Sequence, residues 1–498
     1  MQDVDLPKRQ IYLVYAAMMM ATALSALDGT IINTAMTTII GELGGLRAYT
    51  WVGTAYLLTS TIATPLFGKF SDLFGRRNFT QIAIGTFVVG SLLCAVANSM
   101  TLLVIGRGIQ GIGGGGIMAM SVVVIADIIS PRERGRYVGA FMSVYAVASV
   151  AGPLLGGFFV DQLNWRWIFL INIPLGIVAS AMVHSSLRIP FVKRNTKVDV
   201  LGALLLVSFI TSLVLLISWV SEEWGWSSSP TVAVGALSAT LLAGFLWWEP
   251  RASDPILPLH LFKNRIVQMV IPMVALVGAL ITAVGAFMPL FLQAVSGVSP
   301  MNSGLLMVPM MAGITITSIW VGRRIATTGK YKIWPILGMI CGIAGVVAMT
   351  FINDSPIAIT AAVIGMVFVG FATGATMPTG TLVVQNSVDV RDLGIASSVT
   401  VLCRSLGQTI ALAAFGAIFN AQVIGKIDDE YLRTPRTINN LPEPARSDAI
   451  NVITDGVQAV FMWAVPLAVF AFICTLFIVE LPLRQQTALK EQHDAAVL

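Results

Sequence analysis

The chain is organised as long apolar runs separated by short polar segments. An α-helix needs roughly 20 apolar residues to cross the hydrocarbon of a bilayer, and it satisfies its backbone hydrogen bonds within the segment. The pattern predicts fourteen such helices and no inserted soluble domain. They lie near residues 11–33, 49–69, 79–97, 101–126, 136–160, 166–187, 200–219, 231–248, 267–293, 302–322, 333–351, 357–381, 394–420 and 456–480. The sequence therefore predicts an all-α integral membrane protein.

Composition agrees with a surface that faces lipid. Of the 498 residues, 56% are hydrophobic and 11% are charged, whereas a soluble domain is about one quarter charged. These figures exclude a disordered chain and a disulfide-stapled secreted domain. The four cysteines each lie in an apolar run and the three histidines are scattered, so neither a metal site nor a catalytic cluster is predicted. The net charge of +5 does not indicate a nucleic-acid partner.

The basic residues predict the orientation in the membrane. With fourteen spans, 22 of the 30 Lys and Arg fall on the side of the N-terminus and 6 on the other, while Arg107 and Arg404 lie within spans. By the positive-inside rule, both termini are cytoplasmic in a multi-pass protein of the cell membrane. The longest outer loop, 421–455, is polar and proline-containing; it is either a solvated loop or a substrate lid.

An internal repeat divides the chain. Residues 68–75 and 322–329 share the same spacing of small residues after the second and tenth spans, with Asp72 in the first copy and Ala326 in the second. This predicts an N-terminal six-helix half (1–190), two inserted helices (191–260) and a C-terminal six-helix half (261–498). Paired halves are typical of secondary transporters that place the substrate site between them.

Several segments together resemble a known family. They are residues 27–35, 51–58, 68–77, 107–111, 152–157, 165–176 and, in the C-terminal half, 404–407. With these segments the chain resembles transporters of the major facilitator superfamily, in the fourteen-span drug:proton antiporter branch. One departure is that the first-span segment continues Ala35-Met36-Thr37, where the branch usually has Ala-Leu-Pro. The resemblance implies two pseudo-symmetric six-helix halves plus two additional central helices.

Asp28 and Arg107 are the candidates for proton coupling. A charge inside a span costs at least about 2.5–3.5 kcal/mol, so Asp28 needs a compensating partner. The functional interpretation is a carboxyl that takes up a proton outside and releases it inside, and the alternative is a structural carboxyl. Arg107 close to Asp28 would favour the carboxylate; the alternative is an arginine that only satisfies helix carbonyls.

The loop after the second span is a candidate gate. Its candidate residues are Gly68, Asp72, Gly75, Arg76 and Arg77. The resemblance implies a latch in which Asp72 lies near a helix N-terminus of the other half, where the helix dipole attracts anions. Ordinary positive-inside topology would explain the two arginines equally well, but it leaves the spaced glycines unexplained.

The fifth span carries the antiporter motif of this branch at Gly152, Pro153, Gly156 and Gly157. Proline bends a helix and glycine permits close approach of a neighbour. The resemblance places this contact between the two halves. The alternative is a kinked helix without a role in transport. The glycines at 111–116 fit a dinucleotide-binding pattern, but they lie inside a membrane span, so close helix packing is the better interpretation.

Aromatic side chains and one arginine are candidates for a substrate cavity. Aromatic rings can stack on flat or cationic substrates, although each ring could equally pack against lipid or protein. Arg404 could contact an anionic group or hydrogen-bond structurally. The cavity candidates are Tyr56, Phe141, Tyr145, Phe287, Phe291 and Arg404.

These observations predict a proton-coupled exporter of amphipathic small molecules that works by alternating access. No nucleotide-binding loop is visible, so transport is expected to draw on an ion gradient and no cofactor is expected. The resemblance implies that the ion is the proton. The alternative is a lipid or glycolipid exporter on the same fold; a channel, a membrane sensor or an enzyme is disfavoured. Asp28 is the only acid well inside a span, which predicts neutral or monocationic lipophilic substrates. A monomer is expected.

Overall fold

The computed structural model describes most of the chain. The described residues are 7–43, 49–130, 133, 137, 144, 147–148, 151–152, 154–160, 162–187, 199–220, 225, 227–253, 255–257, 259–298, 300–353, 355–389, 392–423, 426 and 441–484. Within these ranges the regular structure is entirely helical. The predicted all-α class is therefore confirmed.

The helices form three groups along the chain. The first group, called the N half below, comprises α1 (Lys8–Leu43), α2 (Tyr49–Phe74), α3 (Arg76–Ala95), α4 (Met100–Ile128), α6 (Trp167–Leu170) and α7 (Asn172–Ser186). Next come α8 (Val200–Trp219), α9 (Ser229–Trp248) and the short η3 (Glu249–Arg251) and η4 (Leu259–Lys263). The last group, the C half, comprises α10 (Arg265–Ala294), α11 (Pro300–Leu306), α12 (Val308–Thr328), α13 (Ile333–Met349), α14 (Pro356–Ser387), α15 (Leu393–Val423) and α17 (Ala445–Leu476).

Eleven described helical segments are long and apolar enough to cross a membrane. Two further predicted spans coincide with α13, which has only 17 residues, and with α2, which is long enough but carries polar residues along its length. Of the predicted span 136–160, the structure describes residues 137, 144, 147–148, 151–152 and 154–160. Of the predicted outer loop 421–455, it describes residues 421–423, 426 and 441–455, and α17 already begins at Ala445, so the loop ends about ten residues earlier than predicted. Eleven of the predicted spans thus have a matching apolar helix, and the count of fourteen stays a prediction.

The sequence sets several helix ends locally. Side chains of Ser99, Ser228 and Ser355 accept hydrogen bonds from backbone N–H groups in the first turns of α4, α9 and α14. Gly75, with a φ of 97°, separates α2 from α3. Gly329, with a φ of 73°, ends α12. A left-handed backbone is open to glycine without strain, so these two residues let the chain reverse at the bundle end.

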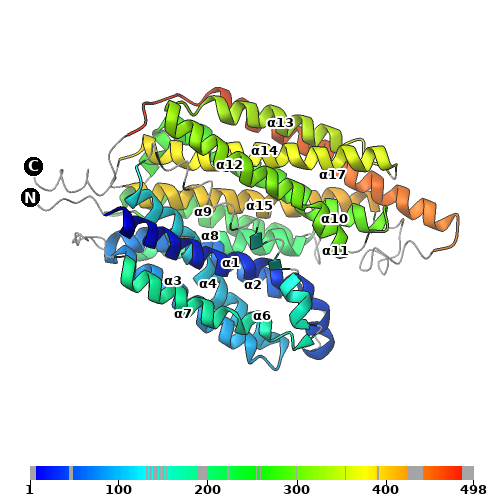
Figure 1. Cartoon of the computed structure of the whole chain (residues 1–498), viewed down its shortest axis with the longest axis horizontal. Helices are drawn as coiled ribbons and strands as arrows, with labels where there is room; N and C mark the ends of the chain where they lie inside the picture. Colours follow the sequence, from blue (N-terminus) through cyan, green and yellow to red (C-terminus); the bar gives the residue numbers. More distant parts are fainter. Residues whose placement is uncertain are drawn as a thin grey trace, which may run out of the picture.

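The two halves lie side by side and diverge from one end (Figure 1). Helix α1 begins and α17 ends at the same end of the bundle, which we call the terminal end. At this end, α15 of the C half packs against α2 and α4 of the N half. Because successive helices run in opposite directions, the loop after α2 and the start of α15 both lie at the terminal end.

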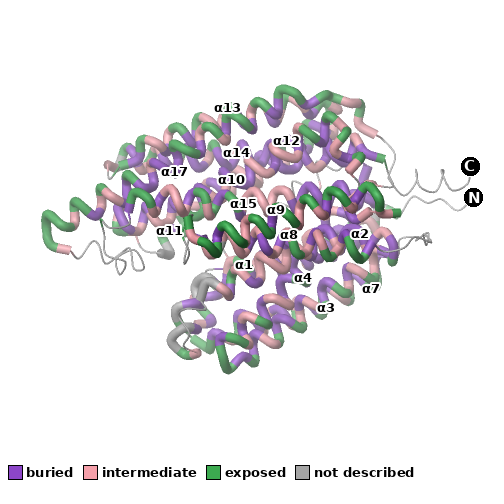
Figure 2. Tube along the Cα trace, turned by 180° about the vertical axis from the view of Figure 1, so that it is seen from behind, coloured by how far each residue is buried: buried purple, intermediate pink, exposed green. Residues whose placement is uncertain are grey.

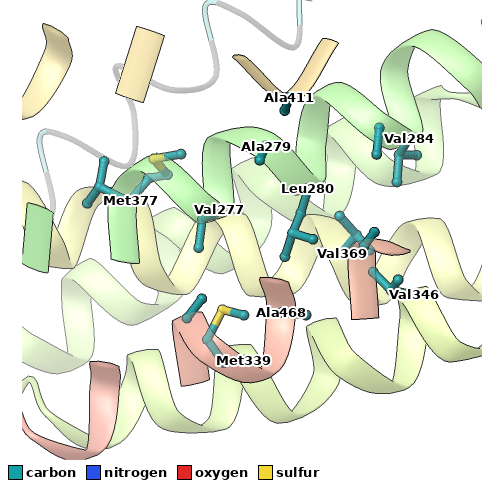
Figure 3. Packing of buried hydrophobic residues seen from close by; sticks show 14 of the residues in the cluster. Val277, Ala279, Leu280, Val284, Met339, Val346, Val369, Met377, Ala411 and Ala468 are labelled. Carbon is teal, nitrogen blue, oxygen red and sulfur yellow. The ribbon is translucent and has the colours of Figure 1, made fainter. Parts of the chain in front are cut away.

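The C half has an apolar core. Val277, Leu280 and Val284 of α10 belong to one buried cluster with Met339 of α13, Val369 of α14 and Ala468 of α17 (Figure 3). Helices α13 and α14 carry no Asp, Glu, Lys or Arg. Because lipid tails are as apolar as these side chains, close van der Waals packing between the helices, and not removal from water, holds this half together.

Helices α8 and α9 pack on one another, and α8 also contacts α2 and α15. Their outer faces expose apolar residues such as Leu204 and Val232, as the green segments of α8 and α9 in Figure 2 show. Exposed apolar faces on a helix pair fit contact with lipid. The predicted boundaries at residues 190 and 260 stay a prediction, since 188–198 are outside the described residues.

Candidate functional site

Asp28 lies at the centre of a buried polar network in the N half. Its side chain is buried, with 1% of the residue exposed, and Arg107 is 2% exposed. Arg107 Nη1 donates to Asp28 Oδ2 at 2.5 Å. Gln110 Nε2 and Asn172 Nδ2 donate to Asp28 Oδ1 at 2.7 and 3.0 Å. The carboxylate therefore has three donors from two other helices, α4 and α7.

Three further hydrogen bonds connect the donors. Arg107 Nη1 also donates to Gln110 Oε1 at 2.7 Å, and Ser91 Oγ of α3 accepts from Gln110 Nε2 at 2.7 Å. Asn172 Nδ2 lies 3.3 Å from the same hydroxyl. Residues three apart share a helix face, which is why Arg107 and Gln110 both reach Asp28. A buried ion pair needs such added hydrogen bonds to offset desolvation.

The sequence predicted Asp28 and Arg107 but gave no role to Gln110, Asn172 or Ser91. Gln110 and Asn172 lie in the segments that carry the family resemblance, and a polar amide inside an apolar span is a usable signal because it needs partners. Ser91 gives no comparable signal, since a serine can hydrogen-bond to its own helix backbone, as it does to Phe87.

Tyr56 connects this network to a cavity. The Arg107 guanidinium lies 4.4 Å from the centroid of the Tyr56 ring, a cation–π contact. The Tyr56 hydroxyl is 3.0 Å from Ser25 Oγ. Both Tyr56 and Ser25 line the cavity, whereas Asp28 and Arg107 do not. The ion pair is thus one layer behind the cavity wall, with Tyr56 between the two.

The cavity has a volume of about 450 Å³ and is shared by the two halves. Its wall is mostly apolar, with scattered hydroxyl groups and three methionines. Arg404 is the one charged side chain among its described lining residues. The lining residues are Ser25, Ala26, Gly29, Thr30, Tyr56, Ser60, Thr64, Gly114, Gly115, Met118, Ile281, Met311, Ile314, Thr315, Ser318, Thr373, Met377, Pro378, Val401, Arg404, Ser405 and Gln408.

Close helix packing shapes the N-half side of this cavity. A β-carbon at Gly115 would clash with the backbone carbonyl of Ser60 on α2, and one at Gly113 would clash with the backbone of Phe87 on α3. The glycine run of α4 therefore allows α2 and α3 to approach at backbone distance. This agrees with the packing interpretation of residues 111–116.

Two of the predicted cavity residues line the cavity and two do not. Tyr56 and Arg404 are in its wall. Phe291 is fully buried in the C-half core, and the Phe287 ring packs against Phe419 with centroids 5.6 Å apart. Both rings face neighbouring helices of their own half, which corrects their assignment to this cavity. Phe141 and Tyr145 lie outside the described residues.

The candidate gate loop lies against the start of α15. Apart from Gly75 it is helical and not a loop, since Gly68 and Asp72 are on the last turns of α2 and α3 begins at Arg76. Asp72 forms an ion pair with Arg76, and Arg76 Nε donates to Asp127 Oδ2 of α4 at 2.7 Å. A β-carbon at Gly394 would be 2.6 Å from Asp72 Oδ1, so the carboxyl lies directly on the first turn of α15. The positive end of the α15 dipole favours an anion there.

Gly68 has a steric role at the same contact. A β-carbon at Gly68 would clash with the Ser398 side chain of α15. Arg77 is half-buried on α3. The gate loop thus joins the two halves at the terminal end through Gly68 and Asp72, the geometry that a latch requires.

Of the residues of the antiporter motif, Gly152 is the one whose neighbouring atoms the structure describes, and these neighbours belong to the N half. A β-carbon at Gly152 would clash with Thr30 of α1, whose Oγ1 donates to the Ala148 carbonyl at 2.9 Å. A β-carbon at Gly157 would meet open space, and Gly156 is buried. Pro153 lies outside the described residues. At Gly152 the expected contact between the halves is not present. The space that a side chain would fill there is occupied by Thr30 of α1, which belongs to the same half.

A second polar cluster fixes the N half at the opposite end. Arg166 Nη1 and Trp165 Nε1 donate to the Glu42 carboxylate at 2.6 and 2.7 Å. These hydrogen bonds, that of Arg166 first, lower the pKa of Glu42. The segment 165–176 therefore ties α6 to the end of α1.

Comparison with known proteins gives a consistent result. A family model described as Major Facilitator Superfamily matches residues 18–412. "Multidrug transporter protein MdtP" of Bacillus subtilis is 36% identical, over 88% of this chain and 80% of that protein. "Efflux pump FUS6" of Gibberella fujikuroi is 31% identical, over 96% and 90%. Among solved structures, the human organic anion transporter MFSD10 has a TM-score of 0.63 at 14% identity, covering 94% of this chain and 100% of that one.

Proposed function

Because the chain belongs to the Major Facilitator Superfamily, we propose that it exports amphipathic small molecules across the cell membrane in exchange for protons. It is a membrane transporter and not an enzyme. Relatives named as a multidrug transporter and an efflux pump support drug-like substrates. In this proposal the terminal end of the bundle faces the cytoplasm.

The observation that carries the proposal is the contact series from the cavity to Asp28. Tyr56 forms part of the cavity wall and stacks on Arg107, and Arg107 pairs with Asp28. When Asp28 binds a proton, its carboxyl becomes neutral. The buried Arg107 guanidinium then keeps its positive charge but has only a weak hydrogen-bond partner in place of a carboxylate. Arg107 must then find other acceptors, and its movement displaces Tyr56 at the cavity wall.

This series couples the proton to the substrate by reciprocal linkage. If protonation of Asp28 changes the affinity of the cavity, then substrate in the cavity changes the proton affinity of Asp28 by the same factor. Transport gains a direction through alternating access: the two halves rock about the site between them, so the site opens to one side of the membrane at a time. In this proposal the contact of Asp72 with the first turn of α15 closes the terminal end while Asp28 takes up a proton from the outside, and its release opens that end.

The cavity wall indicates the substrate class. Methionine side chains adapt to different apolar shapes, and the scattered hydroxyl groups give weak hydrogen-bonding sites without imposing one geometry. Exchange of one proton for one monovalent cation moves no net charge across the membrane, and Arg404 in the cavity wall is unfavourable for a second positive charge on the substrate. We therefore assign lipophilic substrates that are neutral or carry a single positive charge, handled by a monomer without a cofactor.

The proton-coupling test uses Asp28→Asn in proteoliposomes with an imposed pH gradient. Asparagine keeps the shape and the hydrogen-bonding oxygen but does not titrate. We expect at least a tenfold loss of gradient-driven transport with substrate binding retained, since about 1.4 kcal/mol corresponds to each factor of ten. Asp448→Asn, an exposed aspartate at the start of α17, is the matched control. Gradient-driven transport by Asp28→Asn at the wild-type rate would refute the assignment.

The substrate class is tested with matched mono- and bis-quaternary ammonium compounds of similar size. Export of a dication for one proton moves an uncompensated charge against the membrane potential, about 2.3 kcal/mol per 100 mV. We expect several-fold faster efflux of the monocation. Equal or faster efflux of the dication contradicts the single-carboxyl assignment.

A further inference from the structure

A second group of buried charges lies where the inserted helices α8 and α9 meet the terminal end of α2. Asp199 precedes the first turn of α8, and Glu249 follows α9. Lys69 lies on α2, directly after the gate residue Gly68. Their exposed fractions are 9%, 1% and 8%. No part of the transport mechanism described above uses these residues.

One oxygen of each carboxyl is fully engaged. Asp199 Oδ1 accepts from Gly202 N and from Trp248 Nε1, both at 2.9 Å. Glu249 Oε1 accepts from Leu257 N. These bonds fix the two side chains to the start of α8 and to the segment that follows η3.

The other oxygen of each carboxyl is buried without a hydrogen-bond partner among the described residues. These atoms are Asp199 Oδ2 and Glu249 Oε2. Both lie over Gly202: a β-carbon there would clash with Asp199 Oδ2 and would be 3.1 Å from Glu249 Oε2. The two oxygens therefore occupy one small buried space, which the absence of a side chain at Gly202 leaves open.

Two ionised carboxyls are unfavourable in such a place. Burial penalises each charge, and like charges at short range penalise the second one further. Lys69 and Asp199 both lie close enough to Glu249 to act on its charge. Lys69 balances one negative charge, and a single proton neutralises the other. The neighbouring Arg251 is directed to Trp247, whose carbonyl and ring it contacts. A metal cation is disfavoured, because it would add positive charge beside Lys69.

We propose that Asp199 and Glu249 bind one proton between their two free oxygens, at a site separate from Asp28. The proton converts the mutual repulsion of the oxygens into a hydrogen bond and makes the group with Lys69 neutral. It thereby stabilises the contact of the α8–α9 pair with α2. Since Lys69 is next to Gly68, loss of this proton acts on the helix that carries the gate loop.

The first test is infrared spectroscopy of the full chain in lipid nanodiscs at neutral pH. An Asp28→Asn background removes the contribution of the transport carboxyl. We expect that Glu249→Gln and Asp199→Asn each remove one carboxylic-acid carbonyl band, because a single remaining carboxyl beside Lys69 ionises. Glu443→Gln, an exposed glutamate ahead of α17, is the control and should leave the band unchanged. An acid band that survives both substitutions overturns the proposal.

Lys69→Met tests the charge balance independently. Without the lysine, a pair that holds one proton keeps a buried negative charge with no counter-ion. We expect a second proton to bind near neutral pH and the acid band to increase about twofold. An unchanged or weaker band contradicts the proposed balance.

Thermal stability against pH supplies a readout that does not depend on transport. Unfolded carboxyls are ionised above about pH 4–5, whereas the native pair keeps its proton. The native state then binds more protons than the unfolded state, so stability falls as pH rises until the pair deprotonates. The slope of stability against pH in this range measures how many more protons the native state binds. We expect Glu249→Gln to reduce that slope by the contribution of one proton, and an unchanged slope contradicts the shared proton.

Discussion

The N half and the C half share a predicted repeat but differ in what they bury. The N half encloses a carboxylate, a guanidinium and two amides around Asp28. The C half encloses an apolar core between α10, α13 and α14, and its charged residue at the cavity, Arg404, lies on the wall. At the terminal end the contrast recurs: the N-half loop has Asp72 on α15, and the equivalent C-half position is Ala326.

This difference separates two tasks. A buried carboxylate can switch between its charged and its protonated state only if hydrogen bonds offset the desolvation of the charge. The N half provides such hydrogen bonds to Asp28. An apolar core has one well-packed state and resists deformation. In our proposal the N half responds to the proton, and the C half is the rigid body against which it moves.

Arg107→Met should have the largest effect on the N half. It leaves Asp28 buried without a counter-ion, and breaking such a pair costs about 3–5 kcal/mol. We expect strong destabilisation at neutral pH that diminishes at low pH, since protonation removes the unpaired charge. Thermal unfolding in nanodiscs across pH measures this.

The double variant Asp28→Asn with Arg107→Met is the internal control, because it removes both charges together. It should be more stable than Arg107→Met alone. If the double variant is as unstable as the sum of its two parts, the two side chains are not energetically coupled.

Phe291→Ala should weaken the C half by a different mechanism. Truncating a fully buried phenylalanine costs about 3–5 kcal/mol through lost burial and a cavity, at the same level as the previous variant or slightly below it. We expect a lower unfolding temperature whose deficit does not change between pH 5 and pH 8. A deficit that titrates would show that the C half also contains a coupled ionisable group.

Asp72→Asn should have the smallest effect of the three. A charge at a helix N-terminus is worth about 0.3–1 kcal/mol, and up to about 2 kcal/mol when partly buried. We expect a few-fold change in turnover with substrate affinity almost unchanged. Initial rates in proteoliposomes over a range of substrate concentrations separate the two. Turnover equal to wild type would exclude the latch.

The sequence alone was informative where a single residue breaks a strong pattern. Asp28 and Arg107 are conspicuous because charges are costly inside spans, and the structure places them in direct contact. Local signals also set helix ends, as at Ser99 and Gly75. Phe287 was misassigned because an aromatic residue in a span is equally suited to a cavity wall and to a core.

What the sequence determined is the helical class, the positions of the spans and the residues whose charge needs a partner, because apolar length and charge cost are local properties. The tertiary structure alone decided which groups meet. Gln110 and Asn172 come from two different helices and meet at Asp28 only through packing, and Ser91 of a third helix accepts hydrogen bonds from both amides. Likewise Asp199 and Glu249 are 50 residues apart, and their contact over Gly202 depends on how α8 and α9 pair. Hydrogen bonds and charge interactions act over a few ångströms, so the distances that select them are set by the fold.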